Sequence, residues 1–498
     1  MAFAGCSTDA VSPGAGGSPS AGGGRRPLLE PLGIRWAGSS AVGGSGATAG
    51  LGSPTAGSGG APGSAGASTG GGGTTGGAGA SGAPKLDWGH GQADGTHQTI
   101  QGFGLNDALL SATWSTQVLD NLFTTKGDSG IGLQVLRIGM SSDGNLAGTT
   151  QSNIDGAKSR GAKIIGSTWS PPASCKTNGK TIDGGHTKDT LLRVLVGYDR
   201  CLRQEKTDSM AMSIGNEPDF ASCGTAEPCN GNYDTTLYTA KEMVAFIKVA
   251  GPKLQALTPP VKVISPEASE WLHTWSNESA TGSIPGNKNS SDPMKCGFPA
   301  SNAACTNGDG YDYGHWLAKD PDAWKALDIL GVHEYDTQHA EPWPADVTVA
   351  RKEVWQTEMS GVLWWPEQGT GSKGTDTIEN GVAVAGWIHS ALVVGEASAW
   401  LWWWYNAYNT DDNEGLLLGK TGTTLTRRYY ALGNYSKFVR PGYVMVDVTG
   451  NSNADILLSA FKGTDGIVVV AINKGAAGRY RADRDFRRNG ARLDDAPT

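Results

Sequence analysis

Beyond Lys85 the chain alternates between eight short apolar runs and longer stretches with helical spacing. The runs cover residues 99–104, 133–139, 163–170, 209–216, 261–266, 326–333, 353–358 and 398–405. Between several of them, at 190–204, 238–257 and 380–394, apolar residues recur at steps of three and four, as in amphipathic helices. Strands that alternate with helices form parallel sheets. Eight such units predict a closed (β/α)8 TIM barrel, which is an α/β fold.

The alternation changes after the eighth run. Residues 444–448, 456–460 and 466–472 are apolar stretches separated by Gly, Asn and Asp turns, which is typical of antiparallel strands. We therefore expect residues 85–435 to form the barrel and residues 436–475 to form a small antiparallel β-sandwich beside it.

Both ends of the chain differ in composition from the middle. Residues 7–84 are mostly Gly, Ser, Ala and Thr, with too few large apolar side chains to offset the entropy of ordering, so that the head at 1–84 is expected to be a flexible linker. Residues 476–498 are rich in Arg and Asp and lack a strand pattern. A frameshift or truncated gene end explains this tail, and a natural disordered tail is the alternative.

The cysteines point to a compartment outside the cytoplasm. Cys6 follows Phe3-Ala4-Gly5, which resembles the end of a bacterial lipoprotein signal whose cysteine receives a lipid anchor. The charged and apolar segments that should precede it are absent, so a start codon assigned too late and a chance match are both open. Six further cysteines can close as local pairs, which favours a secreted or cell-surface protein. These pairs are Cys175 with Cys201, Cys223 with Cys229, and Cys296 with Cys305.

The net charge limits the class of partner. A formal charge of −8 and a pI near 5.5 argue against binding to nucleic acid, which requires a concentrated basic surface. No apolar run is long enough to span a bilayer, so no integral membrane segment is expected. No cysteine spacing forms a convincing zinc site, and we expect neither a metal nor a cofactor. A neutral polymer substrate is compatible with this charge.

Polar and aromatic residues follow nearly every apolar run. In a barrel of this kind the active site lies at the carboxyl ends of the strands. Strand ends border loops, which are polar in any case, but this does not account for the repeated Trp, Tyr and Arg. Seven of these residues are expected to bind substrate. They are Arg137, Trp169, Asn216, His333, Tyr335, Trp404 and Tyr405.

Two glutamates at the ends of the fourth and seventh runs form the outstanding pair. Glu217 lies in Asn216-Glu217-Pro218, and Glu358 ends the run 353–358. Cleavage of a glycosidic bond uses one protonated and one ionised carboxyl group on opposite sides of the anomeric carbon. Glu217 is the expected general acid/base, its pKa raised by desolvation and by nearby negative charge, and Glu358 is the expected nucleophile.

The neighbours of the pair have expected roles of their own. Arg137 and Tyr335 are expected to donate hydrogen bonds to Glu358, and Asn216 to bind a sugar hydroxyl next to the anomeric centre. His333 fits either a satisfied core histidine or a site residue. Glu334 should alternate away from the barrel interior. Glu267 is the reserve catalytic carboxylate.

Several motifs together resemble glycoside hydrolase family 30, over roughly residues 98–474. The most specific lie at 99–104, 167–172, 176–179, 216–218, 328–333, 355–358 and 435–442. The resemblance implies a (β/α)8 retaining enzyme in which Glu217 is the acid/base and Glu358 the nucleophile. It also implies that a strand from before Gln101 joins the side sandwich. Residues 436–442 and 468–474 are closest to the bacterial glucuronoxylanase branch, which cleaves β-1,4-xylan.

One departure from that branch affects specificity. Members that require a glucuronic acid side chain have an arginine shortly after Trp-Trp-Tyr, whereas here Tyr405 is followed by Asn406-Ala407-Tyr408-Asn409. We therefore expect a monomeric endo-β-1,4-xylanase with a relaxed need for side chains. Another family 30 activity (β-1,6-glucanase, β-galactanase or glucosylceramidase-like β-glucosidase) is one alternative. A carbohydrate-binding surface protein without catalysis is the alternative from another class.

Overall fold

The computed structural model describes fourteen segments of the chain, all within one compact unit, Ala83–Thr498. They are residues 85–86, 97–108, 112–142, 145–146, 150–170, 173, 209–220, 236–277, 310–335, 340–361, 376–407, 414–419, 422–449 and 453–475. The predicted linker, all seven cysteines, the predicted helix at 190–204, the motif at 176–179 and the tail at 476–498 lie outside the described residues.

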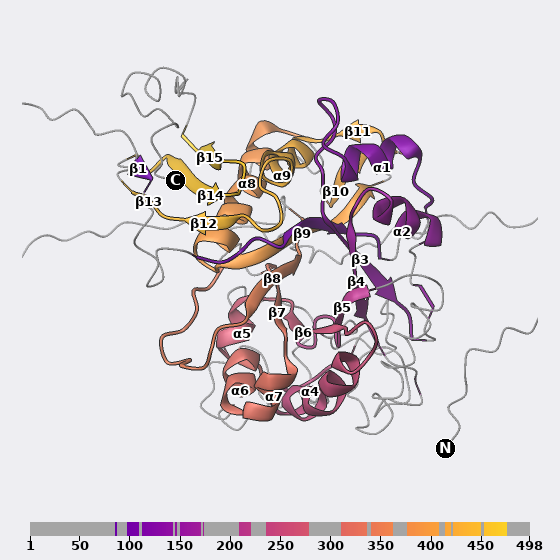
Figure 1. Cartoon of the computed structure of the whole chain (residues 1–498), viewed down its shortest axis with the longest axis vertical. Coiled ribbons are helices and arrows are strands. Elements are labelled where there is room, and N and C mark those ends of the chain that lie inside the picture. Colours follow the sequence, from indigo (N-terminus) through magenta and orange to yellow (C-terminus); the bar gives the residue numbers. More distant parts are fainter. Residues whose placement is uncertain are drawn as a thin grey trace, which may run out of the picture. The chain divides into compact units, whose positions relative to one another are not determined.

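Eight parallel strands close into a barrel (Figure 1). They are β2 Gly102–Asn106, β3 Val135–Met140, β4 Lys163–Thr168, β5 Ser209–Ser213, β6 Lys262–Ala268, β7 Ile329–His333, β8 Glu353–Glu358 and β9 Ala397–Ala407. Each strand pairs with the next along the chain, and β9 pairs with both β8 and β2, which closes the ring. Each predicted run overlaps one of these strands, so the predicted barrel is confirmed.

An apolar plug fills the barrel interior below the site. It consists of Val135, Ile165, Ala211, Ile264, Ile329, Trp355, Ala399 and Leu401, contributed by seven of the eight strands. Side chains alternate between the two faces of a strand, so the residue two positions further along also points inward. Arg137 follows Val135 in this way, and Ser167 follows Ile165. The plug therefore carries a layer of polar side chains at the carboxyl ends of the strands.

Helices surround the barrel and bury their apolar faces against it. They are α1 Thr116–Phe123, α2 Gln151–Lys158, α4 Ala240–Gln255, α5 Leu272–Trp275, α6 Tyr313–Lys319, α7 Pro321–Ala326, α8 Ile378–Val393 and α9 Arg427–Ser436. The predicted helices at 238–257 and 380–394 correspond to α4 and α8. A capping box between Thr239 and Glu242 starts α4 and satisfies donors at its N-terminus. None of the described helices is long and apolar enough to cross a membrane.

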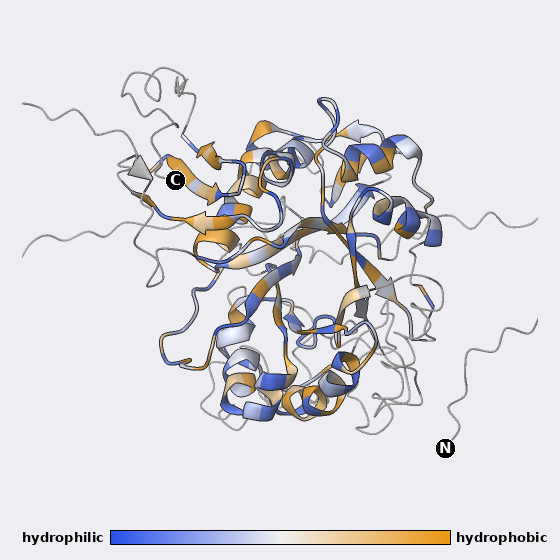
Figure 2. Cartoon of the chain, in the orientation of Figure 1, coloured by the Kyte–Doolittle hydropathy of each residue, from blue (hydrophilic) through white to orange (hydrophobic). Residues whose placement is uncertain are grey.

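A small antiparallel sheet flanks the barrel, as predicted. Its strands β12 Val444–Val446, β14 Ile456–Lys462 and β15 Ile467–Asn473 are ordered β12-β14-β15, and Figure 2 shows that they are largely hydrophobic. The short strands β1 Lys85–Leu86 and β13 Val448–Thr449 pair with each other. Two further strands, β10 Gly415–Leu418 and β11 Thr424–Leu425, extend the barrel sheet next to β9.

Candidate active site

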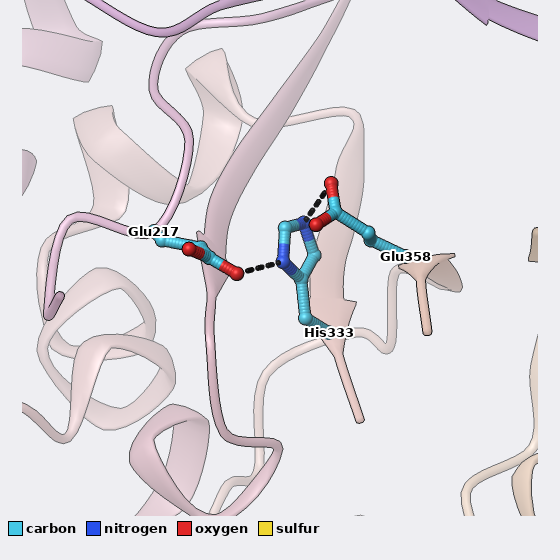
Figure 3. Close-up of side chains that lie close together, drawn as sticks. All are labelled: Glu217, His333 and Glu358. Atoms are coloured by element: carbon cyan, nitrogen blue, oxygen red, sulfur yellow. Dashed lines mark hydrogen bonds and ion pairs between the residues drawn. The ribbon is translucent and has the colours of Figure 1, made fainter. Parts of the chain in front are cut away.

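Glu217 and Glu358 meet at the carboxyl end of the barrel. Glu217 follows β5 and Glu358 is the last residue of β8. A carboxylate oxygen of Glu217 lies within 4.8 Å of one of Glu358, and the two residues are only 8% and 5% exposed. His333 stands between them (Figure 3), with Nδ1 3.0 Å from Glu217 Oε1 and Nε2 3.8 Å from Glu358 Oε2.

The backbone at Glu217 is unusual. Its φ of 46° lies in the left-handed region, which costs a non-glycine residue on the order of 1–3 kcal/mol. Two hydrogen bonds hold the conformation: the Glu217 N–H donates to the Glu267 carbonyl over 2.9 Å, and the Phe220 N–H donates to the Glu217 carbonyl over 3.0 Å. The second bond closes a tight turn at Glu217–Phe220. Residues held in sparsely populated conformations concentrate at functional sites.

Arg137 organises the polar layer from β3. Its guanidinium is fully buried and donates five hydrogen bonds, each to a different side chain. The acceptors are Asn106 Oδ1 at 2.7 Å, Glu358 Oε2 at 2.7 Å, Ser167 Oγ at 3.0 Å, Asn216 Oδ1 at 2.6 Å and Glu267 Oε2 at 2.9 Å. Burial lowers the pKa of Arg137, but the carboxylates of Glu267 and Glu358 more than offset this and raise it. The guanidinium therefore stays charged and fixes the geometry of the layer.

The surroundings of the two glutamates give them different pKa values. Burial, together with the negative charges of Asp219 and Glu267, raises the pKa of Glu217 to about 8. Burial also raises the pKa of Glu358, but the facing charges of His333 and Arg137 oppose it and leave that pKa at about 7. Tyr335 adds a hydrogen bond from its hydroxyl to Glu358 Oε1 over 3.1 Å. Glu217 therefore keeps its proton to a higher pH than Glu358 does.

Aromatic side chains form one wall beside this layer. Trp169 lies 5.0 Å from the Arg137 guanidinium carbon, measured to the ring centroid, and 6.1 Å from the ring of Trp403. Trp403 stacks on Trp404 with centroids 5.4 Å apart, and Trp404 Nε1 donates to the Ala108 carbonyl over 3.1 Å. Trp169 and Trp404 were predicted, whereas Trp403 was not. Its place in the run Trp402-Trp403-Trp404 was the available signal.

Tyr405, which was predicted to bind substrate, packs in the apolar layer outside the polar residues around the two glutamates. Its ring is 4% exposed and packs 4.7 Å from the ring of Trp114, in the apolar layer between barrel and helices. A register shift in the pairing of β2 with β9 sets Leu105 opposite Trp402 and Asn106 opposite Trp404. The extra residue leaves Trp403 and Trp404 together and turns Tyr405 away from the site. Tyr405 is a packing residue in this arrangement.

Glu334 and Glu267 are two further buried glutamates with different surroundings. Glu334 lies behind the site, fully buried, and accepts a hydrogen bond from Trp400 Nε1 over 3.1 Å. Burial raises its pKa to about 8. Glu267, the reserve carboxylate, is buried and paired with Arg137; although burial raises its pKa, the charges of Arg137 and His333 bring it below its ordinary value. Glu267 is therefore held ionised as a partner of Arg137.

This arrangement suits acid/base and nucleophilic chemistry on an uncharged substrate. One carboxyl group is set to carry a proton and the other to carry a charge, with fixed donors around the second. Glu217, His333 and Glu358 are also close enough to offer ligand atoms to a cation. The guanidinium of Arg137 already pairs with Glu358, and its positive charge disfavours a second cation at the same carboxylate.

Comparison with known proteins agrees with the predicted resemblance. The chain is 27% identical over 392 residues to glucuronoxylanase XynC of Bacillus subtilis strain 168, which covers 76% of each protein. The family 30 subfamily 8 xylanase Xyn30A from Clostridium acetobutylicum is 24% identical, with a TM-score of 0.56 over 77% of this chain and 83% of that one. The endo-β1,6-glucanase BT3312 is 17% identical, with a TM-score of 0.58 over 78% and 86%. No family model matches the chain.

Proposed function

We propose that this chain is a retaining endo-β-1,4-xylanase of glycoside hydrolase family 30. The observation that carries the proposal is the approach of Glu217 and Glu358 to within 4.8 Å. Retaining glycosidases place their two carboxyl groups about 5–5.5 Å apart, whereas inverting enzymes need about 6.5–9.5 Å to admit a water molecule. The short separation favours direct attack by one carboxylate on the sugar.

In the first step, Glu358 attacks the anomeric carbon and Glu217 gives its proton to the departing glycosidic oxygen. Arg137 and Tyr335 each donate to one oxygen of Glu358, which fixes the direction in which the carboxylate can attack. A glycosyl ester on Glu358 and a shortened chain with a new hydroxyl group result.

In the second step, Glu217 acts as a base. Having lost its proton, its carboxylate removes a proton from a water molecule, and the resulting hydroxide attacks the anomeric carbon and releases Glu358. His333 is 3.0 Å from Glu217 and is buried. Burial is the main cause that lowers the pKa of His333, and its Nδ1 atom can donate a hydrogen bond to an ionised Glu217 or accept one from a protonated Glu217.

The substrate follows from the relative and from one sequence difference. Glucuronoxylanase XynC is named for a xylan with glucuronic acid branches. This chain has Asn406-Ala407-Tyr408-Asn409 where an arginine would be expected to pair with such a branch. We therefore propose β-1,4-xylan as substrate without a strict requirement for glucuronate. A guanidinium pairs with a carboxylate through two parallel bonds that an amide cannot replace.

The test is product analysis on a panel of polysaccharides. Purified protein is incubated with glucuronoxylan, arabinoxylan, unbranched β-1,4-xylan and β-1,6-glucan, in parallel with Glu358→Gln. We expect xylo-oligosaccharides from all three xylans and none from the Glu358→Gln variant. Products from β-1,6-glucan alone would identify another activity of the same site. Binding of a polymer without any cleavage would favour the non-catalytic alternative.

The cellular setting is part of the same proposal. A polymer substrate cannot enter a cell intact, so we propose that the protein acts outside the cytoplasm as a secreted or surface protein. Residues 1–84 would then tether a monomeric catalytic unit, with Cys6 as the site of a lipid anchor. In this proposal, residues 85–435 form the catalytic barrel and residues 436–475 form the side sandwich.

A further inference from the structure

A buried carboxylate lies in the tight turn that begins at the proposed acid/base. Asp219 is the third residue of the tight turn that begins at Glu217, and it is 0% exposed. Its Oδ2 atom accepts three hydrogen bonds from the segment that follows β6: from the Ser269 N–H at 3.0 Å, from Ser269 Oγ at 2.8 Å and from His273 Nδ1 at 2.5 Å. Its Oδ1 atom also lies 2.9 Å from the Ser269 nitrogen. These bonds attach the Glu217 turn to the end of β6.

The same segment reaches the nucleophile. The Ser269 carbonyl accepts a hydrogen bond from the Tyr335 N–H over 3.1 Å, and the Tyr335 hydroxyl donates to Glu358 Oε1 over 3.1 Å. Asp219, Ser269 and Tyr335 thus form a continuous hydrogen-bonded connection from the Glu217 turn to Glu358. A change at Asp219 can therefore alter the position of both glutamates.

We infer that Asp219 is a positioning residue for Glu217: its buried carboxylate anchors the turn and adds a fixed negative charge behind the acid/base. The role of Glu217 as acid/base comes from the proposed function. The effect of Asp219 on the titration of Glu217 does not depend on that role. Asp219 touches no reacting atom in this account. It acts through Glu217.

The charge of Asp219 is well maintained. Burial raises the pKa of Asp219, but the hydrogen bonds and charge of His273 and the bonds from Ser269 outweigh this and lower it. His273 Nε2 also lies 3.4 Å from Glu270 Oε2, so the imidazole stands between two carboxyl groups.

Other charged or titratable groups face Glu217 from each neighbouring strand. Arg137 comes from β3, Glu267 from β6, His333 from β7 with Tyr335 just beyond it, and Glu358 from β8. After burial, Asp219 is the largest cause of the raised pKa of Glu217, ahead of the opposing effect of Arg137. Removing the charge of Asp219 should therefore lower the pKa at which Glu217 loses its proton.

Asp219→Asn is the decisive variant because it removes the charge and keeps one oxygen that can accept from Ser269 Oγ and His273 Nδ1, while its amide nitrogen takes the place of Oδ1. His273→Gln is the matched control, since its amide can donate in place of the imidazole while the Ser269 N–H and hydroxyl still hold the Asp219 carboxylate. Folding of both is checked by thermal melting. The readout is the titration midpoint of Glu217, followed by NMR in protein labelled at glutamate carboxyl carbons and assigned with Glu217→Gln.

We expect the Glu217 midpoint to fall by about 1 pH unit in Asp219→Asn and to stay or rise in His273→Gln. An unchanged midpoint in Asp219→Asn overturns the inference, as does an equal fall in both variants, which would report damaged packing instead of lost charge. Should Asp219→Asn fail to fold, His273→Gln is the test by itself. A lower Glu217 midpoint in His273→Gln then contradicts the inference, and an unchanged or higher midpoint supports it.

Activity is measured separately on the same samples. With xylan, the alkaline limb of the kcat/KM profile of Asp219→Asn should move to lower pH by the same amount as the Glu217 midpoint. Because the titration requires no turnover, a wild type that cleaves no polymer would refute the proposed function and leave the inference standing. A shifted midpoint with an unshifted alkaline limb would show that Glu217 is not the acid.

Discussion

Arg137 donates a hydrogen bond to Glu358 over 2.7 Å, and the side chains are 0% and 6% exposed. Removing one partner of a buried ion pair leaves the other charge without compensation, which is more damaging than the net value of the pair. The contact therefore links the stability of the site to the charge of the proposed nucleophile.

Arg137→Lys should lower kcat/KM by about 10²–10³-fold, because an ammonium group cannot bond five acceptors arranged around a planar guanidinium. The pKa of Glu358 should rise, so that the acid limb of the pH profile moves to higher pH. Steady-state kinetics across pH measure both. Arg160→Lys is the control, because Arg160 pairs with the exposed Asp120 outside the barrel; a similar loss there would point to a general effect of the substitution.

The wild type should have a narrow pH optimum for xylan. Activity requires ionised Glu358 and protonated Glu217, so kcat/KM should fall below pH about 7 and above pH about 8. The two limbs belong to the coupled pair. An aryl glycoside with a good leaving group depends less on the acid, and we expect its alkaline limb to be weaker. Equal alkaline limbs on both substrates would argue against Glu217 as acid.

Trp403→Ala should raise KM for xylo-oligosaccharides about tenfold, because the indole packs against Trp169, whose ring lies 5.0 Å from the Arg137 guanidinium carbon. Tyr405→Ala should instead destabilise the fold by about 3–5 kcal/mol and leave KM near the wild-type value, because the ring packs against Trp114. Kinetics and urea unfolding of both variants separate binding from packing. A raised KM in Tyr405→Ala, with lost stability in Trp403→Ala instead, would indicate that Tyr405 contacts substrate.

Glu334→Gln should stabilise the protein at alkaline pH. The folded pKa of about 8 is raised above the ordinary value, so the contribution of Glu334 is fully present below the unfolded pKa and is lost as pH rises through 8. The neutral amide has no such dependence, and it can keep the bond from Trp400. Urea unfolding at pH 5 and pH 9 measures the change. Glu379→Gln, at an exposed position on α8, is the control and should show no such gain.

Much of the fold could be predicted because barrel strands are locally encoded. Each strand is a short apolar run, and the residues that end it lie at one end of the barrel whatever the intervening loops do. This is why Arg137, Asn216, His333 and Tyr335 could be grouped with the two glutamates before any contact was known. The environment of each glutamate followed less directly, since it depends on which neighbours face it.

The sequence was less informative where contacts are distant or the strand is irregular. Strict alternation does not show the register shift opposite β9, so the positions of Trp403 and Tyr405 relative to the glutamates could not be predicted from it. The connection from Asp219 to Ser269 and His273 spans 50 and 54 positions along the chain. Asp219 is polar and two residues from Glu217, which was a usable signal, but its partners have no distinguishing motif.

The stereochemistry of the first product tests the account most directly. Proton NMR of a xylo-oligosaccharide digest, recorded before mutarotation, shows which anomer is released. Two carboxyl groups as close as Glu217 and Glu358 predict a β-anomer first, because double displacement retains the configuration. Initial release of the α-anomer would mean a single displacement by water and would contradict the role assigned to Glu358.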